Sequence, residues 1–319
     1  MKFSLSTIFV LGFAIVNAQL RVLPLQASPQ QDSVTRQVID LPFWDDFSRS
    51  GDSPDTTLWL YGPDIYVNAT IGHNPPTYKT ATFDGLNALG LAYQIENENG
   101  GPGDSLVSQP IDLSKVAPGN INSVYLSFYW QEGGNGEQPN ETDSLVLYFS
   151  KAVTDSTFRW DAKWSRIGGN PTQPFEQVLV HVDSMAYFHD QFQFKFVSYS
   201  SLQGPFDTWN IDYIYLNQHR DENDFYELDQ AISGSPSSLF SPYYELPANV
   251  FFKNPSRYLS NQRFLISNLE NEIEPDNFFY SIENLTTGEN FGTYQSGGTN
   301  SLNALEIREV NSPGFNSIV

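Results

Sequence analysis

The chain has 319 residues, of which 37 are acidic and 16 basic, for a formal net charge of −21. This length allows one large domain or one domain with part of a second, and the acidity argues against nucleic acid as a partner, because phosphate binding needs faces rich in lysine and arginine. The absence of cysteine excludes disulfides, thiolate nucleophiles and cysteine-ligated zinc.

The N-terminus has the form of a secretory signal peptide. A positively charged start precedes an apolar run at residues 8–16, and small residues mark a cleavage site before Gln19. This run is too short for a stable membrane span, and we expect a protein that does not span the membrane. We therefore expect a signal peptide over residues 1–18 and an extended lead-in over 19–40. The mature protein is expected in the periplasm, at the outer membrane or at the cell surface.

From Leu41 onward, short aromatic or β-branched runs alternate with clusters of Gly, Pro, Asn and Asp, as strands alternate with turns. In the segment QFQFKFVSY, Phe192, Phe194 and Phe196 share one face of a strand and polar residues take the other. We predict an all-β protein whose first domain is a jelly-roll β-sandwich over about residues 41–220. Its expected strands include residues 65–68, 80–83, 123–130, 144–150, 177–182, 191–199 and 209–216.

A charged exit and an irregular, aromatic segment separate this domain from a second β-pattern. Residues 221–260 are predicted to form a linker, and residues 261–319 to begin an immunoglobulin-like β-sandwich. Only about four strands can be recognised there, where such a sandwich has about seven. We therefore expect the second domain to be incomplete and the sequence to be a fragment of a longer protein.

Four aspartates are candidate ligands of one structural Ca²⁺ ion. Asp45 and Asp46 lie at the first strand, Asp84 follows the strand at 80–83, and Asp212 lies inside the last strand of the predicted sandwich. A carboxylate within an aromatic strand is costly unless it is paired or ligating, and Ca²⁺ takes about six to eight oxygen ligands. The alternative interpretation is that Asp212 caps a turn or accepts backbone hydrogen bonds.

The sequence carries no catalytic motif, so we expect no enzymatic activity. There is no nucleophile elbow, no P-loop and no dinucleotide-binding glycine motif, and a carboxylate pair for glycoside hydrolysis is a spatial feature that sequence does not reveal. Tyrosines and tryptophans could form a sugar-binding platform instead. Most tryptophans, however, lie in strand-like segments that favour the core: Trp59, Trp160, Trp164 and Trp209.

Seven stretches carry a resemblance to known proteins: LPFWDDFS (41–48), PDTTLW (54–59), NPPTYKTATFDGLNALGLAY (74–93), GDSLVSQPIDLS (103–114), SVYLSFYWQEGGNGEQPNETDSLVLYF (123–149), FQFKFVSYSS (192–201) and DTWNIDYIYLNQHR (207–220). Together they look like the MAM-like or laminin-G-like jelly-roll module of exported Bacteroidetes proteins. Within that group the chain resembles the plug protein associated with the type IX secretion translocon. The resemblance covers about residues 41–260.

The resemblance implies a binding role, because a plug of this family sits on the periplasmic mouth of the outer-membrane translocon barrel and closes it. It also implies a structural cation near the first and last strands, with Asp45, Asp46 and Asp212 as the candidates here. MAM domains proper contain cysteines and this chain has none, so the comparison with extracellular receptors does not carry over. We expect a non-catalytic protein that docks on the translocon or another envelope protein. The alternatives are a surface adhesin or carbohydrate-binding module, whose partners are glycans, and accessory domains of a secreted hydrolase.

Overall fold

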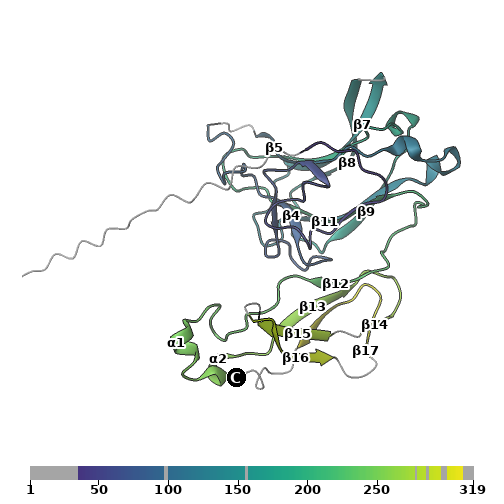
Figure 1. Ribbon diagram of the computed structural model, residues 1–319. Coiled ribbons are helices and arrows are strands. Elements are labelled where there is room, and N and C mark those ends of the chain that lie inside the picture. The colour runs from purple at the N-terminus through teal and green to yellow at the C-terminus, as the bar shows by residue number, and fades with distance from the viewer. Residues whose placement is uncertain are drawn as a thin grey trace, which may run out of the picture.

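The computed structural model describes residues 35–96, 100–154, 157–276, 279–284, 287–295 and 300–311. The predicted signal peptide and residues 19–34 of the predicted lead-in lie outside these residues. The described chain is all-β, as predicted, with antiparallel sheets and only short helices. Its two units are a β-sandwich and a smaller unit packed beneath it (Figure 1). Within the described ranges, no helix has both the length and the apolar character needed to cross a membrane.

One layer of the sandwich is a six-stranded antiparallel sheet. Its strands follow the order β3-β4-β11-β6-β9, and β1 also pairs with β11. This is the layer that faces the second unit (Figure 1). Its strands are β1 (Phe43–Asp45), β3 (Tyr66–Asn68), β4 (Thr80–Phe83), β6 (Tyr125–Glu132), β9 (Glu176–His181) and β11 (Trp209–Asn217).

The other layer is a five-stranded antiparallel sheet in the order β2-β5-β10-β7-β8. Three 3₁₀ helices connect strands of the sandwich, at Leu113–Lys115, Pro118–Ser123 and Met185–Tyr187. The five strands are β2 (Trp59–Tyr61), β5 (Gly101–Ser108), β7 (Ser144–Thr154), β8 (Thr157–Ile167) and β10 (Phe194–Ser200).

The order of the strands confirms the predicted jelly roll. The eight strands from β4 to β11 divide into the layers β4-β11-β6-β9 and β5-β10-β7-β8. Counted from one to eight along the chain, these layers read 1-8-3-6 and 2-7-4-5, which is the arrangement of two Greek keys that defines a jelly roll. The short strands β1, β2 and β3 extend the two layers at β11, β5 and β4.

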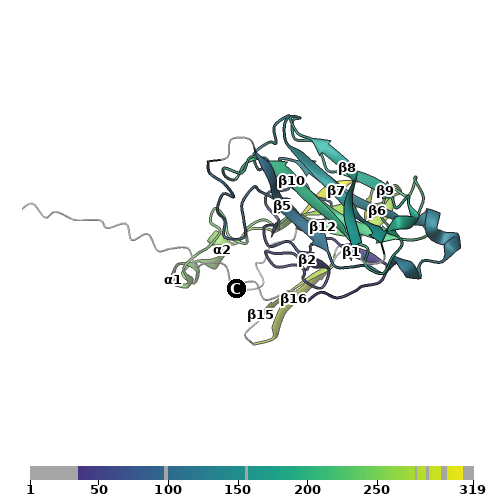
Figure 2. The ribbon, with the colours of Figure 1, turned by 90° about the horizontal axis from the view of Figure 1, so that it is seen from above.

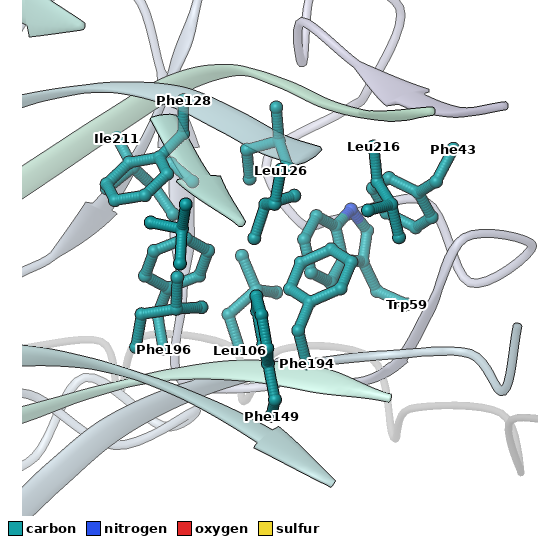
Figure 3. Packing of buried hydrophobic residues seen from close by; sticks show 14 of the residues in the cluster. Phe43, Trp59, Leu106, Leu126, Phe128, Phe149, Phe194, Phe196, Ile211 and Leu216 are labelled. Carbon is teal, nitrogen blue, oxygen red and sulfur yellow. The ribbon is translucent and has the colours of Figure 1, made fainter. Parts of the chain in front are cut away.

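Aromatic side chains fill the space between the two layers (Figure 3). Phe194 and Phe196 point inward from β10, as their period-two spacing predicts, and both are fully buried. Phe196 meets Phe128 of the opposite sheet with ring centres 4.8 Å apart, and Phe194 lies 5.0 Å from Phe43. Burying each such ring stabilises the fold by roughly 1.5–3 kcal/mol. The same alternation turns Lys195 outward.

The tryptophans depart from the prediction in one case. Trp59 and Trp209 are core residues and Trp164 packs against the core, as expected, but Trp160 is 38% exposed on the outside of the sandwich. The reason is a β-bulge in β8. Trp164 pairs with the inward Leu147, whereas the register shift after that pair places Trp160 opposite Ser150. A bulge adds one residue to a strand, so the side chains that precede it, including that of Trp160, point to the opposite face of the sheet.

The second unit starts earlier than predicted. The strand β12 (Gln230–Ser233) lies inside the segment predicted as linker and pairs with β13 (Arg263–Asn268). The sequence of β12, QAIS, contains no aromatic and a single β-branched residue, so it lacks the composition typical of a strand. The assignment of the second unit to the immunoglobulin-like class stays a prediction. The remaining elements are the helical turns α1 (Ala248–Phe251) and α2 (Pro255–Tyr258) and the strands β14 (Glu274–Asp276), β15 (Phe279–Asn284), β16 (Glu289–Gln295), β17 (Asn300–Leu302) and β18 (Ile307–Asn311).

The described strands of the second unit form three small antiparallel sheets. These are β12-β13-β18, β14-β17 and β15-β16. The first sheet lies against the outer face of the six-stranded layer, where Leu269 buries Tyr129 and Tyr213. The Tyr213 hydroxyl also donates to Asp229 at 2.9 Å. The centre of the six-stranded sheet, at β6 and β11, is therefore covered on both faces.

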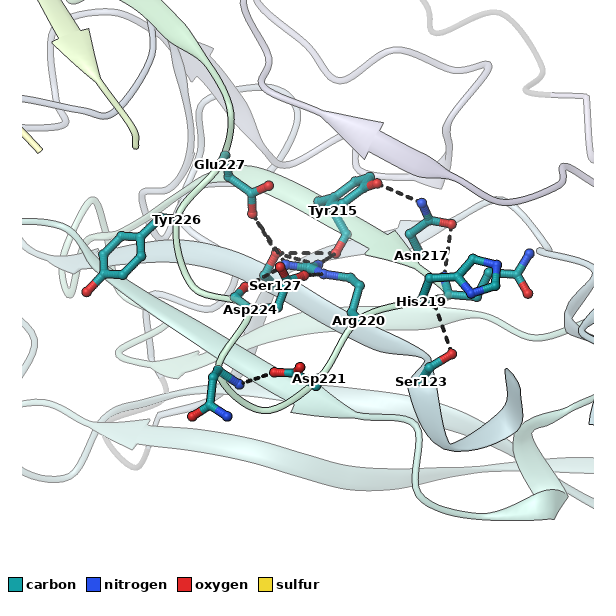
Figure 4. A network of polar contacts seen from close by, with 12 residues as sticks. Ser123, Ser127, Tyr215, Asn217, His219, Arg220, Asp221, Asp224, Tyr226 and Glu227 are labelled. Atoms are coloured by element: carbon teal, nitrogen blue, oxygen red, sulfur yellow. Dashed lines mark hydrogen bonds and ion pairs between the residues drawn. The ribbon is translucent and has the colours of Figure 1, made fainter. Parts of the chain in front are cut away.

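A buried arginine fixes the chain where it leaves the sandwich (Figure 4). The Arg220 guanidinium donates to the Ser127 hydroxyl at 2.8 Å and to the Tyr215 carbonyl at 3.0 Å, and it forms ion pairs with Asp224 and Glu227. Burial raises the pKa of Glu227 to about 7, against the opposing effect of the arginine charge. This network holds the segment that leads to the second unit onto the six-stranded sheet.

Candidate functional site

Two of the predicted metal ligands lie on the neighbouring strands β1 and β11. Asp45 is buried, and its carboxylate accepts hydrogen bonds from the Trp59 indole N–H at 2.6 Å and the Phe47 backbone N–H at 2.9 Å. Burial raises the pKa of Asp45 to about 6. Asp212 is completely buried, and burial raises its pKa well above the ordinary value.

Asp212 organises the loop at residues 74–78. Its carboxylate accepts from the Thr77 backbone N–H at 3.0 Å and the Tyr213 backbone N–H at 2.7 Å, and the Thr77 hydroxyl lies 3.0 Å from both of its oxygens. In the same loop, the carbonyls of Pro75 and Pro76 accept hydrogen bonds from serine hydroxyls of β12 and β13. Asp212 therefore supports a contact between the units, in line with the alternative interpretation of its buried position.

The other two predicted ligands shape turns. Asp46 accepts from the backbone N–H and hydroxyl of Ser48 at 3.1 and 2.7 Å. Asp84 follows the far end of β4 and accepts from the Leu86 backbone N–H at 3.0 Å, an Asx-turn. Its neighbour is a buried carboxylate that the sequence did not single out, Asp104, which accepts the Tyr93 hydroxyl at 2.7 Å. The structure thus brings Asp45, Asp46 and Asp212 to adjoining segments and places Asp84 elsewhere.

These carboxylates do not fit a hard cation well. Both oxygens of Asp45 and of Asp212 already accept N–H groups, and one oxygen each of Asp46 and Asp84 does so, whereas Ca²⁺ needs oxygens free to coordinate it. Within the part of the chain that the structure describes, no group of three or more His, Asp or Glu side chains is placed to hold a metal ion. The Ca²⁺ ion stays a prediction for a melting experiment to decide.

A different candidate site lies on the outer face of the five-stranded sheet (Figure 2). Lys195 occupies the central strand β10, and its ammonium nitrogen lies 5.2 Å from the ring centre of Tyr148 and 4.4 Å from that of Trp160. These distances are those of cation–π contacts. The Tyr148 hydroxyl shares a hydrogen bond of 2.8 Å with the Tyr199 hydroxyl. We call Lys195, Tyr148, Trp160 and Tyr199 the aromatic–lysine platform.

The electrostatics of the platform differ from those of the surrounding surface. Lys195 is partly buried, and this burial lowers its pKa. No hydrogen bond or ion pair joins its ammonium group to any described residue, whereas Lys115 and Lys163 both lie within 2.7 Å of an aspartate oxygen. Burial, with the hydrogen bond to Tyr199, raises the pKa of Tyr148 to about 12. The Tyr148 hydroxyl is therefore protonated at neutral pH.

The sequence contained part of the signal for this site. A lysine at an outward position of a phenylalanine-rich strand was visible in QFQFKFVSY, but its partners come from β7 and β8. Sequence alone does not give the register that places Tyr148 opposite Lys195. The β8 bulge then hid Trp160, which its spacing from Trp164 assigns to the core.

Neither protein-family models nor curated protein sequences match this chain. Among solved structures, similarity is found to the K3 cleaved adhesin domain of Lys-gingipain from Porphyromonas gingivalis w83, with 10% identity and a TM-score of 0.25 over 44% of this chain and 73% of that one. A cyclase from Fischerella sp. TAU has 14% identity and a TM-score of 0.27, over 49% of this chain and 72% of that one. A Stig cyclase from the same source has 13% identity and a TM-score of 0.29, over 57% and 86%. Similarity this weak assigns neither a family nor a function.

Proposed function

We propose that the protein is a non-catalytic, exported binding protein that holds a carbohydrate on the aromatic–lysine platform. The observation that carries the proposal is the placement of the Lys195 ammonium against the rings of both Tyr148 and Trp160 on the sheet face opposite the second unit. Aromatic rings offer flat apolar surfaces to the C–H faces of sugar rings. The tyrosine hydroxyls and the ammonium group supply donors for sugar hydroxyls.

A purely structural role explains these residues less well. Cross-strand aromatic pairs stabilise a sheet by roughly 0.2–1 kcal/mol, but the core between the layers is already filled by buried aromatics. Trp160 adds exposed ring surface outside that core, and Lys195 loses hydration without gaining a carboxylate partner. The cation–π contacts offset only part of the lost hydration of Lys195, so both features favour a ligand that covers the face.

The proposed role is binding rather than catalysis. The platform provides stacking surfaces and hydrogen-bond donors, while a hydrolase acting on sugars needs a pair of carboxylates at the substrate. The single carboxylate of the three central strands, Asp104 of β5, is buried. The platform can therefore retain a sugar without positioning groups to cleave it.

Polysaccharide affinity electrophoresis of the full chain tests the proposal. We expect at least one polysaccharide in the gel to retard the wild-type protein, and Trp160→Ala to abolish that retardation. Trp44→Ala is the matched control, because Trp44 is 37% exposed but lies on the other sheet. The proposal fails if no polysaccharide retards the protein, or if Trp160→Ala and Trp44→Ala behave alike.

Docking on the type IX secretion translocon is a finer expectation that rests on the sequence resemblance alone. Affinity purification of the tagged protein from envelope membranes addresses it directly. Co-purification of an outer-membrane barrel protein is the result expected of a plug. Surface labelling of the protein without any such barrel would remove the plug role and leave the adhesin-like role proposed above.

A further inference from the structure

We infer that the sugar bound by the aromatic–lysine platform carries a negatively charged group, which pairs with the Lys195 ammonium. The inference rests on the carbohydrate-binding role proposed above and specifies its ligand. It follows from the distribution of charge on one sheet face, from the partners of the lysines in the sandwich, and from the contacts of Lys195 with two rings.

The centre of the five-stranded sheet has an outer face without acidic side chains. Register places Val107, Lys195 and Tyr148 side by side on β5, β10 and β7. The next outward row contains Ser105, Val197 and Val146, and the following one Tyr199 and Ser144. Lys195 is the single charged residue of these rows. In a chain with 37 acidic residues, such a face favours an anionic ligand by charge complementarity.

The partners of the other lysines in the sandwich also favour an anionic ligand for Lys195. Residues 41–220 contain five lysines. Lys115, Lys151 and Lys163 form ion pairs with aspartates, and Lys79 donates to the carbonyls of Ser50 and Gly51. Lys195, although partly buried, has no such partner among the described residues. An anionic group on the ligand would supply the partner that the protein provides to the other four.

The overall acidity of the chain does not oppose this pairing strongly. At physiological ionic strength, charges separated by more than about 8 Å are largely screened in water. A charged group at the centre of the face therefore interacts mainly with Lys195 and much less with distant carboxylates. The contact is also partly desolvated by the rings of Tyr148 and Trp160, which strengthens attraction between opposite charges.

A lysine recognises charge more than shape. Its ammonium group is a point charge on a flexible stem, unlike the planar fork of arginine, which matches a carboxylate in two places. The platform is therefore expected to accept a carboxylate or a sulfate on a sugar ring that stacks on Trp160. Either group makes the ligand an anionic saccharide. Polymers that carry one group or the other distinguish a carboxylate from a sulfate.

The test measures binding of the full chain to two pairs of polymers. Polygalacturonate is compared with its fully methyl-esterified form, and dextran sulfate with dextran, for the wild type, Lys195→Met and Lys195→Arg. We expect the wild type to bind at least one acidic polymer about ten- to a hundredfold more tightly than its neutral counterpart, as one charge-assisted hydrogen bond implies. Lys195→Met should lose this preference, and Lys195→Arg should keep most of it.

The outcomes separate the inference from the function on which it rests. A carboxylate ligand is indicated if only polygalacturonate shows the Lys195-dependent preference, and a sulfate if only dextran sulfate does. Equal binding of acidic and neutral polymers, unchanged in Lys195→Met, overturns the inference and leaves carbohydrate binding intact. Binding of none of the four polymers by the wild type overturns both. Melting curves of Lys195→Met serve as the folding control, and they should match or exceed the wild type because burial disfavours the lysine charge.

Discussion

The two outer faces of the jelly roll carry similar aromatic side chains in different surroundings. On the six-stranded sheet, Tyr129 and Tyr213 are buried by Leu269 of the second unit, and the Tyr213 hydroxyl donates to Asp229. On the five-stranded sheet, the Tyr148 hydroxyl shares a hydrogen bond with Tyr199 on the same face, and Trp160 is 38% exposed. Outward aromatic residues therefore indicate a contact surface in both places. The chain itself supplies the contact on one face, and we propose that a ligand supplies it on the other.

The largest expected loss of stability comes from a substitution on the six-stranded sheet, which the second unit covers. Asp212→Ala removes the acceptor for two backbone N–H groups and the Thr77 hydroxyl in a fully buried position. Each buried donor left unsatisfied costs roughly 1–3 kcal/mol, so we expect a loss of about 3 kcal/mol or more in the free energy of unfolding, measured with urea. Asp212→Asn, which keeps one carbonyl acceptor, should cost less. An alanine variant as stable as the wild type would contradict the assigned role of Asp212.

The next effect is a pH dependence at the joint between the units. The raised pKa of Glu227, about 7, means that the folded state holds this proton more tightly than the unfolded state. Its contribution to stability is complete below the unfolded pKa near 4.5 and is lost as the pH rises through 7. Between pH 5 and pH 8 we expect this to remove about 2 kcal/mol. Urea titrations of Glu227→Gln should show a flatter profile, and an equally steep one would contradict the assignment.

A smaller effect on stability is expected for the free face. Tyr148→Ala and Lys195→Met remove surface contacts without opening the core, so each should change the free energy of unfolding by less than about 1 kcal/mol. Tyr148→Ala should weaken polysaccharide binding, and Lys195→Met should lose the preference for acidic polymers. Urea denaturation and polysaccharide binding, measured on the same preparations, would check the predicted stability and the predicted change in binding. Loss of stability comparable to that of Asp212→Ala would mean that the platform is a structural element of the sheet.

The smallest effect is expected from Ca²⁺. Because the carboxylates near β1 and β11 already accept hydrogen bonds, millimolar Ca²⁺ should leave the melting temperature almost unchanged relative to chelator. A rise of several degrees that Asp212→Asn abolishes would instead support the cation predicted from the sequence. Asp84→Asn is the control at the other end of β4.

Much of the fold was predictable because local patterns determine it. The strand at residues 80–83 is observed with the predicted bounds, and the period-two spacing of Phe194 and Phe196 places both in the core. Alternation with turn residues was enough to indicate two antiparallel layers. The start of the second unit was not predictable, because β12 lacks the aromatic and β-branched residues typical of a strand and is stabilised by pairing with β13.

The site was less predictable because it depends on contacts distant in sequence. Lys195 is one residue from each flanking phenylalanine, but it meets Tyr148 only through the pairing of β10 with β7. The β8 bulge, which no local pattern revealed, moves Trp160 from the expected core to the outer face. Conversely, Asp212 was correctly singled out as unusual, but the partner that explains it, Thr77, lies 135 residues away in the chain.

The most direct test of the central claim is hydroxyl-radical footprinting of the full chain with and without polygalacturonate and dextran sulfate. Trp160 and Trp44 have almost equal exposure, 38% and 37%, but lie on opposite sheets. With saturating ligand, we predict that oxidation of Trp160 falls while that of Trp44 is unchanged. Protection of Trp44 with no change at Trp160 would contradict the assignment of the five-stranded sheet as the binding face.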